Sequence, residues 1–128
     1  MAKKRVKKRV MVVDDEENVC QLLEAVLEEE NYDVVTATDG KECLAKLKKI
    51  KPDLILLDMM MPGMSGREVC EKIRADPKTK NLKVIFVTVA RFSELGKNAL
   101  SKLKVIDYVS KPFDNADLVK RVKNALGK

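Results

Sequence analysis

Five short apolar runs, separated by longer amphipathic stretches, constrain the fold of this chain more than any other feature of its sequence. The runs are Val10–Val13, Asp33–Ala37, Leu54–Leu57, Val84–Val87 and Val105–Val109. The first, third and fourth are almost continuously apolar, which is typical of strands covered on both faces of a parallel sheet. The second and fifth are less purely apolar, so we expect them nearer the edges of the sheet.

The stretches between the runs place apolar residues three and four positions apart, as amphipathic helices do. This spacing predicts helices containing Val19–Leu27, Cys43–Ile50, Val69–Ile73, Phe92–Leu103 and Leu118–Leu126. Ser65 and Glu68 form an S-x-x-E capping box before the third helix, and Asp114 and Gly127 are suited to the two ends of the last. The alternation predicts an α/β fold of the (βα)5 type, with a doubly wound, flavodoxin-like, five-stranded parallel sheet and helices on both faces.

The length of 128 residues suits one domain, which we expect to span residues 8–128 after a basic arm at residues 1–7. The formal charge is +6, and six cations precede the first strand: Lys3, Lys4, Arg5, Lys7, Lys8 and Arg9. Residues 10–128 therefore sum to zero, and we interpret the excess as a solvated arm and not as a basic face. Nucleic acid is not an expected partner.

The sequence contains neither an apolar run of membrane-spanning length nor the apolar core of a signal peptide, so we expect a cytoplasmic protein. It contains no histidine, which excludes Ser-His-Asp and Cys-His catalysis and every histidine-ligated metal site. Cys20, Cys43 and Cys70 form no C-x-x-C pair and lie in apolar helical patterns, so we expect them to be buried. Carboxylate, lysine and hydroxyl groups remain for any chemistry.

Residues of these remaining types stand where the predicted strands end. Asp14 and Asp15 follow the first strand, Asp58 the third, Thr88 the fourth and Lys111 the fifth. Because ligands of open parallel sheets bind beyond the carboxyl ends of the strands, we expect these side chains to converge. Oxygen ligands suit Mg²⁺, and an ammonium with a hydroxyl suits a phosphoryl group, so the set indicates transfer of a phosphoryl group to a carboxylate.

Each residue alone has an ordinary explanation, such as an acidic pair favouring a helix N-terminus or a lysine in solvent.

Two other functions of this architecture fit less well. A flavodoxin-like electron carrier needs a phosphate-cradling loop where Asp14–Glu17 stands. A haloacid-dehalogenase-like phosphatase would have a D-x-D motif. Here Met60 stands two residues after Asp58, so the second acid of that motif is missing. The alternative that remains open is a protein-interaction module that works without phosphorylation.

The chain resembles the receiver domains of two-component response regulators, in the stand-alone form typified by the chemotaxis receiver. The resemblance extends from about Lys8 to Leu126, and the D-x-x-M-P-x-x-x-G segment together with K-P-F is its most specific part. The matching segments are Val12–Glu16, Leu56–Gly66, Val87–Thr88 and Asp107–Phe113.

This resemblance implies a role for each residue of the site. Asp58 would be the phosphoacceptor, and Mg²⁺, with Mn²⁺ as a substitute, would be held by Asp14, Asp15, Asp58 and the backbone carbonyl of Met60. Lys111 would contact a phosphoryl oxygen, and its bond to Pro112 would be cis. Thr88 and Tyr108 would act as the switch that reports phosphorylation.

The resemblance also implies partners. The phosphoryl group would come from a histidine kinase or a histidine phosphotransfer protein, and the chain would catalyse only its own phosphorylation and dephosphorylation. A face built from the predicted fourth helix, fifth strand and fifth helix would bind a downstream protein. Since no output domain follows Gly127 in this sequence, we expect the signal to pass through that partner.

Apolar Met60, Val89 and Ala90 are expected to make the aspartyl phosphate long-lived.

Overall fold

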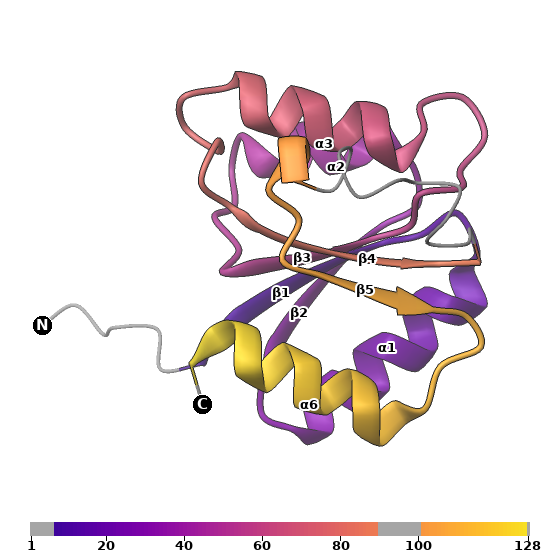
Figure 1. Ribbon diagram of the computed structural model, residues 1–128. Helices are drawn as coiled ribbons and strands as arrows, with labels where there is room; N and C mark the ends of the chain where they lie inside the picture. Colours follow the sequence, from indigo (N-terminus) through magenta and orange to yellow (C-terminus); the bar gives the residue numbers. More distant parts are fainter. Residues whose placement is uncertain (1–6, 90–100, 128) are drawn as a thin grey trace, which may run out of the picture.

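The computed structural model describes residues 7–89 and 101–127, and its centre is one five-stranded parallel sheet (Figure 1). The strand order is β2-β1-β3-β4-β5, which confirms the predicted doubly wound sheet with the second and fifth strands at its edges. Both core clusters draw residues from β1, β3 and β4, which are therefore buried on two faces. The strands are β1 (Arg9–Val13), β2 (Asp33–Ala37), β3 (Leu54–Leu57), β4 (Lys83–Thr88) and β5 (Asp107–Ser110).

Helices cover both faces of the sheet. Helices α1 (Glu17–Glu29) and α6 (Asn115–Leu126) lie on one face, and α2 (Gly40–Leu47) and α3 (Gly66–Ala75) lie on the other (Figure 1). Residues 101–103 are also helical, but most of the helix predicted between residues 92 and 103 lies outside the described residues. None of the helices that the structure describes is long and apolar enough to cross a membrane.

The predicted ends at Ser65, Asp114 and Gly127 are confirmed, whereas α2 ends at Leu47, before the predicted Ile50. Ser65 and Glu68 form the reciprocal capping box of α3. The side chain of Asp114 accepts hydrogen bonds from two backbone N–H groups at the start of α6, and Gly127 ends that helix with φ at 77°. These contacts satisfy backbone groups that a helix leaves without intrahelical partners.

The turn between β3 and α3 depends on a close backbone approach at Gly66. A Cβ atom on this residue would lie 2.0 Å from the carbonyl oxygen of Asp58. The Gly66 N–H also donates a 3.0 Å hydrogen bond to the carbonyl of Met59. The start of α3 is thus packed directly on the residue that ends β3, which fixes the backbone of Asp58.

Strand β5 begins later than the predicted run Val105–Val109. The ladder pairs Ile85 with Asp107, and the strand spans Asp107–Ser110. The shift occurs because Lys104 adopts a left-handed conformation with φ at 55°, so the chain is still turning before it joins the sheet.

Arg74 stabilises this turn from the end of α3. Its guanidinium donates hydrogen bonds to the carbonyls of Leu103 (2.7 Å) and Lys104 (3.2 Å). It also donates to the carbonyls of Lys80 (2.9 Å) and Leu82 (2.6 Å) in the connection before β4. One side chain therefore joins α3 to the connections that lead into both β4 and β5.

Candidate functional site

The carboxyl ends of the strands bring the predicted site residues to one edge of the sheet. Asp14 and Asp58 extend the ladder by one residue: the Asp14 N–H donates to Ala37 at 3.1 Å, and the Asp58 N–H donates to Val13 at 2.9 Å. These residues follow β1 and β3, the neighbours at which the strand order reverses. This is the position at which open α/β sheets bind their ligands.

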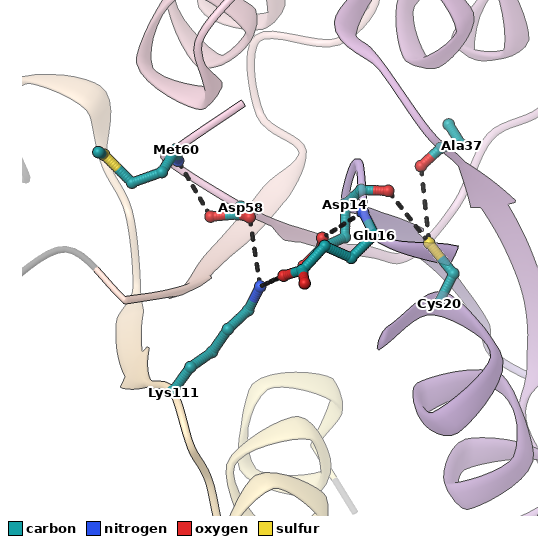
Figure 2. A network of polar contacts seen from close by, with 7 residues as sticks. All are labelled: Asp14, Glu16, Cys20, Ala37, Asp58, Met60 and Lys111. Atoms are coloured by element: carbon teal, nitrogen blue, oxygen red, sulfur yellow. Dashed lines mark hydrogen bonds and ion pairs between the residues drawn. The ribbon is translucent and has the colours of Figure 1, made fainter. Parts of the chain in front are cut away.

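Lys111 extends from the end of β5 to the two buried carboxylates (Figure 2). Its Nζ atom lies 2.6 Å from Oδ2 of Asp14 and 3.2 Å from Oδ2 of Asp58. The side chain of Lys111 is only 10% exposed, and those of Asp14 and Asp58 are 3% and 4% exposed. The ammonium group thus balances part of a negative charge that water barely reaches.

Both carboxylate oxygens of Asp58 have a hydrogen-bond donor. Oδ1 accepts the backbone N–H of Met60 at 3.0 Å, while Oδ2 accepts from Lys111 (Figure 2). Two donors from different parts of the chain hold the carboxylate in one orientation. Because one donor is a fixed backbone group and the other a long side chain, only the contact to Lys111 can be exchanged easily for another.

Burial and charge interactions within the cluster shift the pKa values of Asp14 and Lys111. Burial raises the pKa of Asp14, hydrogen bonds from Lys111 and from the Glu16 N–H oppose this rise, and the negative charge of Asp58 adds to it. Burial acts to lower the pKa of Lys111, but the hydrogen bond to Asp14 and the charges of Asp14 and Asp58 outweigh burial, so the pKa is raised. Lys111 is therefore charged at neutral pH.

Three carboxylates of this cluster could hold one metal ion. Oxygen atoms of Asp14, Asp15 and Asp58 lie within 4.8 Å of one another, and Asp15 is exposed while the other two are buried. Three carboxylates against one ammonium leave an excess of negative charge, and every donor is a hard oxygen. This set fits Mg²⁺, which takes few protein oxygens and keeps several waters, so the exposed side at Asp15 also suits it.

Thr88 and Tyr108 lie on the neighbouring strands. Thr88 is fully buried at the end of β4, and its carbonyl accepts the backbone N–H of Lys111 at 2.9 Å. Tyr108 is half-buried in β5 opposite Phe86, and it packs against the core beneath α2 and α3. The peptide bond between Lys111 and Pro112 is cis. The structure thus places Thr88 one strand and Tyr108 two strands from β3, whose end carries Asp58.

Two residues that the sequence reasoning did not assign also contact the cluster. Oε1 of Glu16 lies 3.6 Å from Nζ of Lys111, so a further carboxylate shares that ammonium group. The thiol of Cys20, in α1, donates to the carbonyl of Asp14 at 3.3 Å. Burial, together with the charge of Asp14, raises the pKa of Cys20 to about 11. Glu16 belongs to the acidic run after β1 and was recognisable there, whereas nothing local in the sequence indicates the contact of Cys20.

Comparison with known proteins agrees with this geometry. The response regulator receiver domain model matches residues 10–123. The alkaline phosphatase synthesis transcriptional regulatory protein PhoP of Bacillus subtilis is 42% identical over 119 residues, which are 93% of this chain and 48% of PhoP. This chain belongs to the response regulator receiver family of two-component signalling. It spans about half the length of this curated relative.

Solved structures show the same fold. Response regulator protein TrrA from Thermotoga maritima, in complex with Mg²⁺-BeF, has 41% identity and a TM-score of 0.79, and the match covers 92% of this chain and 98% of that one. Chemotaxis protein CheY4 of Vibrio cholerae has 29% identity and a TM-score of 0.87, with 94% and 99% covered. The predicted flavodoxin-like architecture is therefore confirmed.

Proposed function

We propose that the chain is a cytoplasmic phosphoacceptor that receives a phosphoryl group on Asp58 from a phosphohistidine of a histidine kinase or a histidine phosphotransfer protein. The observation that carries the proposal is the carboxylate of Asp58, which is buried and oriented by Met60 and Lys111 at the switch point of the sheet. Family membership supports the same role. These 128 residues contain no histidine, so the donor imidazole must lie outside them.

In the proposed reaction a carboxylate oxygen of Asp58 bonds to phosphorus while the bond between phosphorus and the imidazole nitrogen of the donor breaks. The product is an acyl phosphate, and no oxidation or reduction occurs. Lys111 moves from the carboxylate of Asp58 to an oxygen of the transferred group, since its long side chain keeps the charge within reach. The chain catalyses only its own phosphorylation and dephosphorylation and turns over no other substrate.

Asp14, Asp15, Asp58 and the backbone carbonyl of Met60 would hold Mg²⁺, or Mn²⁺ in its place. When bound, the ion would offset negative charge on the phosphoryl oxygens. The carboxylate cluster supports this part of the proposal, and so does the Mg²⁺-BeF complex of the related TrrA. A bound cation would compete with the ammonium group of Lys111 for the carboxylate of Asp14, which lies 2.6 Å from Nζ.

Thr88 and Tyr108 would transmit the modification. In the proposed switch the hydroxyl of Thr88 turns toward the phosphoryl group, and Tyr108 changes rotamer to fill the space left behind. The downstream partner would bind the face around β5 and α6, where Arg121 of α6 already pairs with Asp107 of β5 at 2.6 Å. Phosphorylation would bias an equilibrium between two arrangements of this face.

Intact-protein mass spectrometry after incubation with acetyl phosphate and Mg²⁺ tests the acceptor. The wild type should gain one phosphoryl group, and Asp58→Asn should gain none. Asp39→Asn is the matched control, because Asp39 is an exposed N-cap of α2 and asparagine caps equally well. Labelling of Asp58→Asn would place the acceptor elsewhere. A wild type that takes no label from acetyl phosphate or from any phosphohistidine donor would favour the phosphorylation-independent interaction module.

A further inference from the structure

Three hollows lie together at the edge of the sheet where the strands begin, away from Asp58. The two larger have volumes of about 570 and 480 Å³ and are both lined by Leu47, Lys48, Lys78 and Thr79. The third, of about 110 Å³, shares Asn81 and Leu82 with the second. Neighbouring hollows share lining residues, and we call this adjacent set, from α2 to the start of β5, the basic groove.

The basic groove concentrates positive charge. Lys48, Lys51, Lys72 and Lys78 line the two larger hollows, and Arg74, Lys80, Lys83 and Lys104 line the third. Among the described residues that line the groove, Asp76 is the one acid. Residues 10–128 carry twenty charges of each sign. The eight cations and one carboxylate of the groove therefore differ strongly from the even balance of these residues as a whole. A zero sum over residues 10–128 therefore does not exclude a basic face within them, although the net excess of six cations still lies before residue 10.

Three of these cations are available to a ligand. Within residues 7–89 and 101–127, neither Lys48, Lys51 nor Lys78 lies within ion-pair distance of a carboxylate. All three side chains are exposed. By contrast, Lys46, one turn earlier in α2, pairs with Glu42 at 3.0 Å. Like charges that line one depression without counter-ions repel one another, so an anionic ligand would be bound favourably.

The walls of the groove are apolar beneath the lysines. Leu44, Leu47, Ile50, Pro52 and Leu82 line the two larger hollows, and four of the five are only partly buried. The two larger hollows, of about 570 and 480 Å³, each have room for several apolar side chains. An apolar floor below a cationic rim fits a ligand that presents hydrophobic side chains flanked by carboxylates.

We propose that the basic groove binds an acidic amphipathic segment of a partner protein. Its apolar side chains enter the hollows between α2 and α3, and its carboxylates pair with the ammonium groups of Lys48, Lys51 and Lys78. Single-stranded nucleic acid fits less well, because none of the described residues that line the groove is an aromatic that could stack on bases. A membrane fits less well too, since insertion into lipid needs apolar side chains that project, whereas these are recessed.

The groove lies at the opposite edge of the sheet from the acidic cluster. In Figure 1 the connection from α3 to β4 lies at the left, where β1 begins and α6 ends, whereas the arrowhead of β5 that leads to Lys111 points right. The proposal therefore does not depend on phosphorylation of Asp58. A second partner could be held here while the face around β5 and α6 is engaged.

Fluorescence polarisation with a fluorescein-labelled peptide of glutamate and leucine, the leucines spaced three and four residues apart, tests the proposal. The full chain should bind it with an affinity that falls as salt is raised. Lys48→Glu/Lys78→Glu, which reverses both lysines shared by the larger hollows, should weaken binding at least tenfold, or about 1.4 kcal/mol. Lys41→Glu/Lys120→Glu is the matched control, because it changes net charge equally at exposed sites outside the groove. The control should stay within about twofold of wild type.

Two further probes distinguish the occupants. A peptide with serine in place of leucine should bind at least tenfold more weakly, and equal binding would reduce the groove to a nonspecific cationic surface and overturn the proposal. Unchanged binding by Lys48→Glu/Lys78→Glu would overturn it as well. Duplex DNA and phosphatidylserine vesicles are tested in the same way. If either binds the wild type more tightly than the peptide does, and Lys48→Glu/Lys78→Glu abolishes that binding, the ligand of the groove is nucleic acid or membrane and not a protein. Unaltered circular dichroism of both variants establishes that they fold.

Discussion

The Nζ atom of Lys111 lies 2.6 Å from Oδ2 of Asp14, although 97 positions separate the two residues in the sequence. The contact joins the ends of β5 and β1, between which β3 and β4 lie in the sheet. It makes Lys111 the counter-ion of the acidic cluster and a competitor of any cation that binds there. The first prediction follows from this competition.

Replacing Lys111 by methionine should separate stability from metal affinity. With chelator present, loss of the ammonium group leaves Asp14 and Asp58 without their shared donor, and unfolding should become easier by about 1–3 kcal/mol. Affinity for Mg²⁺ should rise, because the competing cation is gone. Denaturant unfolding across a Mg²⁺ titration measures both quantities. Weaker Mg²⁺ binding by the variant would contradict the competition.

Mg²⁺ should stabilise the wild-type chain through Asp15. At a free concentration one hundred times Kd, a ligand that binds only the folded state adds about 2.7 kcal/mol. Asp15→Asn should lose most of this gain with little change in chelator, because Asp15 is exposed. Glu17→Gln is the control: it removes an exposed carboxylate from the first turn of α1 and should keep the Mg²⁺ response. An equal response of both variants would remove Asp15 from the ligand set.

Gly66→Ala, at the start of α3, should be more destabilising than Gly63→Ala in the loop before it. Gly63 has a φ of 75° and open space around it, so alanine there meets only backbone strain of about 1–2 kcal/mol. At Gly66 the new methyl group would lie 2.0 Å from the backbone of Asp58, so the turn must move and the cost should exceed about 3 kcal/mol. Urea denaturation ranks the two. Phosphorylation of Asp58 should fall in the Gly66 variant, even under conditions where it is folded.

Lys104→Gly should stabilise the chain by about 1 kcal/mol, because glycine adopts the left-handed conformation with φ at 55° without steric cost. Lys102→Gly, two residues earlier and helical, should instead destabilise by about 1 kcal/mol. Chemical denaturation should therefore show changes of opposite sign in the free energy of unfolding when glycine replaces these two exposed lysines. Destabilisation by both would mean that the turn does not have this conformation in solution.

The aspartyl phosphate should persist for minutes or longer. Met60 and Val89, 54% and 63% exposed, bring apolar side chains near the ends of β3 and β4, where neither can orient an attacking water. Ala90, to which the same expectation was attached, lies outside the described residues. Met60→Asn should shorten the lifetime several-fold, since an amide can hydrogen-bond water. The decay of the phosphorylated mass in Mg²⁺ measures it, and loss from the wild type within seconds would refute the expectation.

Much of the fold follows from local pattern, and the remainder depends on long-range contact. The strands Asp33–Ala37 and Leu54–Leu57 have the predicted bounds, because their limits are set by apolar periodicity and turn residues. Strand β5 does not, because its start depends on the turn at Lys104 that Arg74 stabilises from another helix. The convergence of the acids and lysine could be predicted, because parallel strands end at one edge. Which oxygen Lys111 contacts could not be predicted, since that depends on side-chain packing.

Segregation of charge also has a consequence for kinetics. Eight cations border the basic groove at one edge of the sheet, while Asp14, Asp15, Glu16 and Asp58 gather at the other. These two groups of opposite charge contribute a dipole directed along the strands. A charged partner is turned by that field before contact, so encounters are biased toward one orientation and ionic strength acts mainly on how fast complexes form.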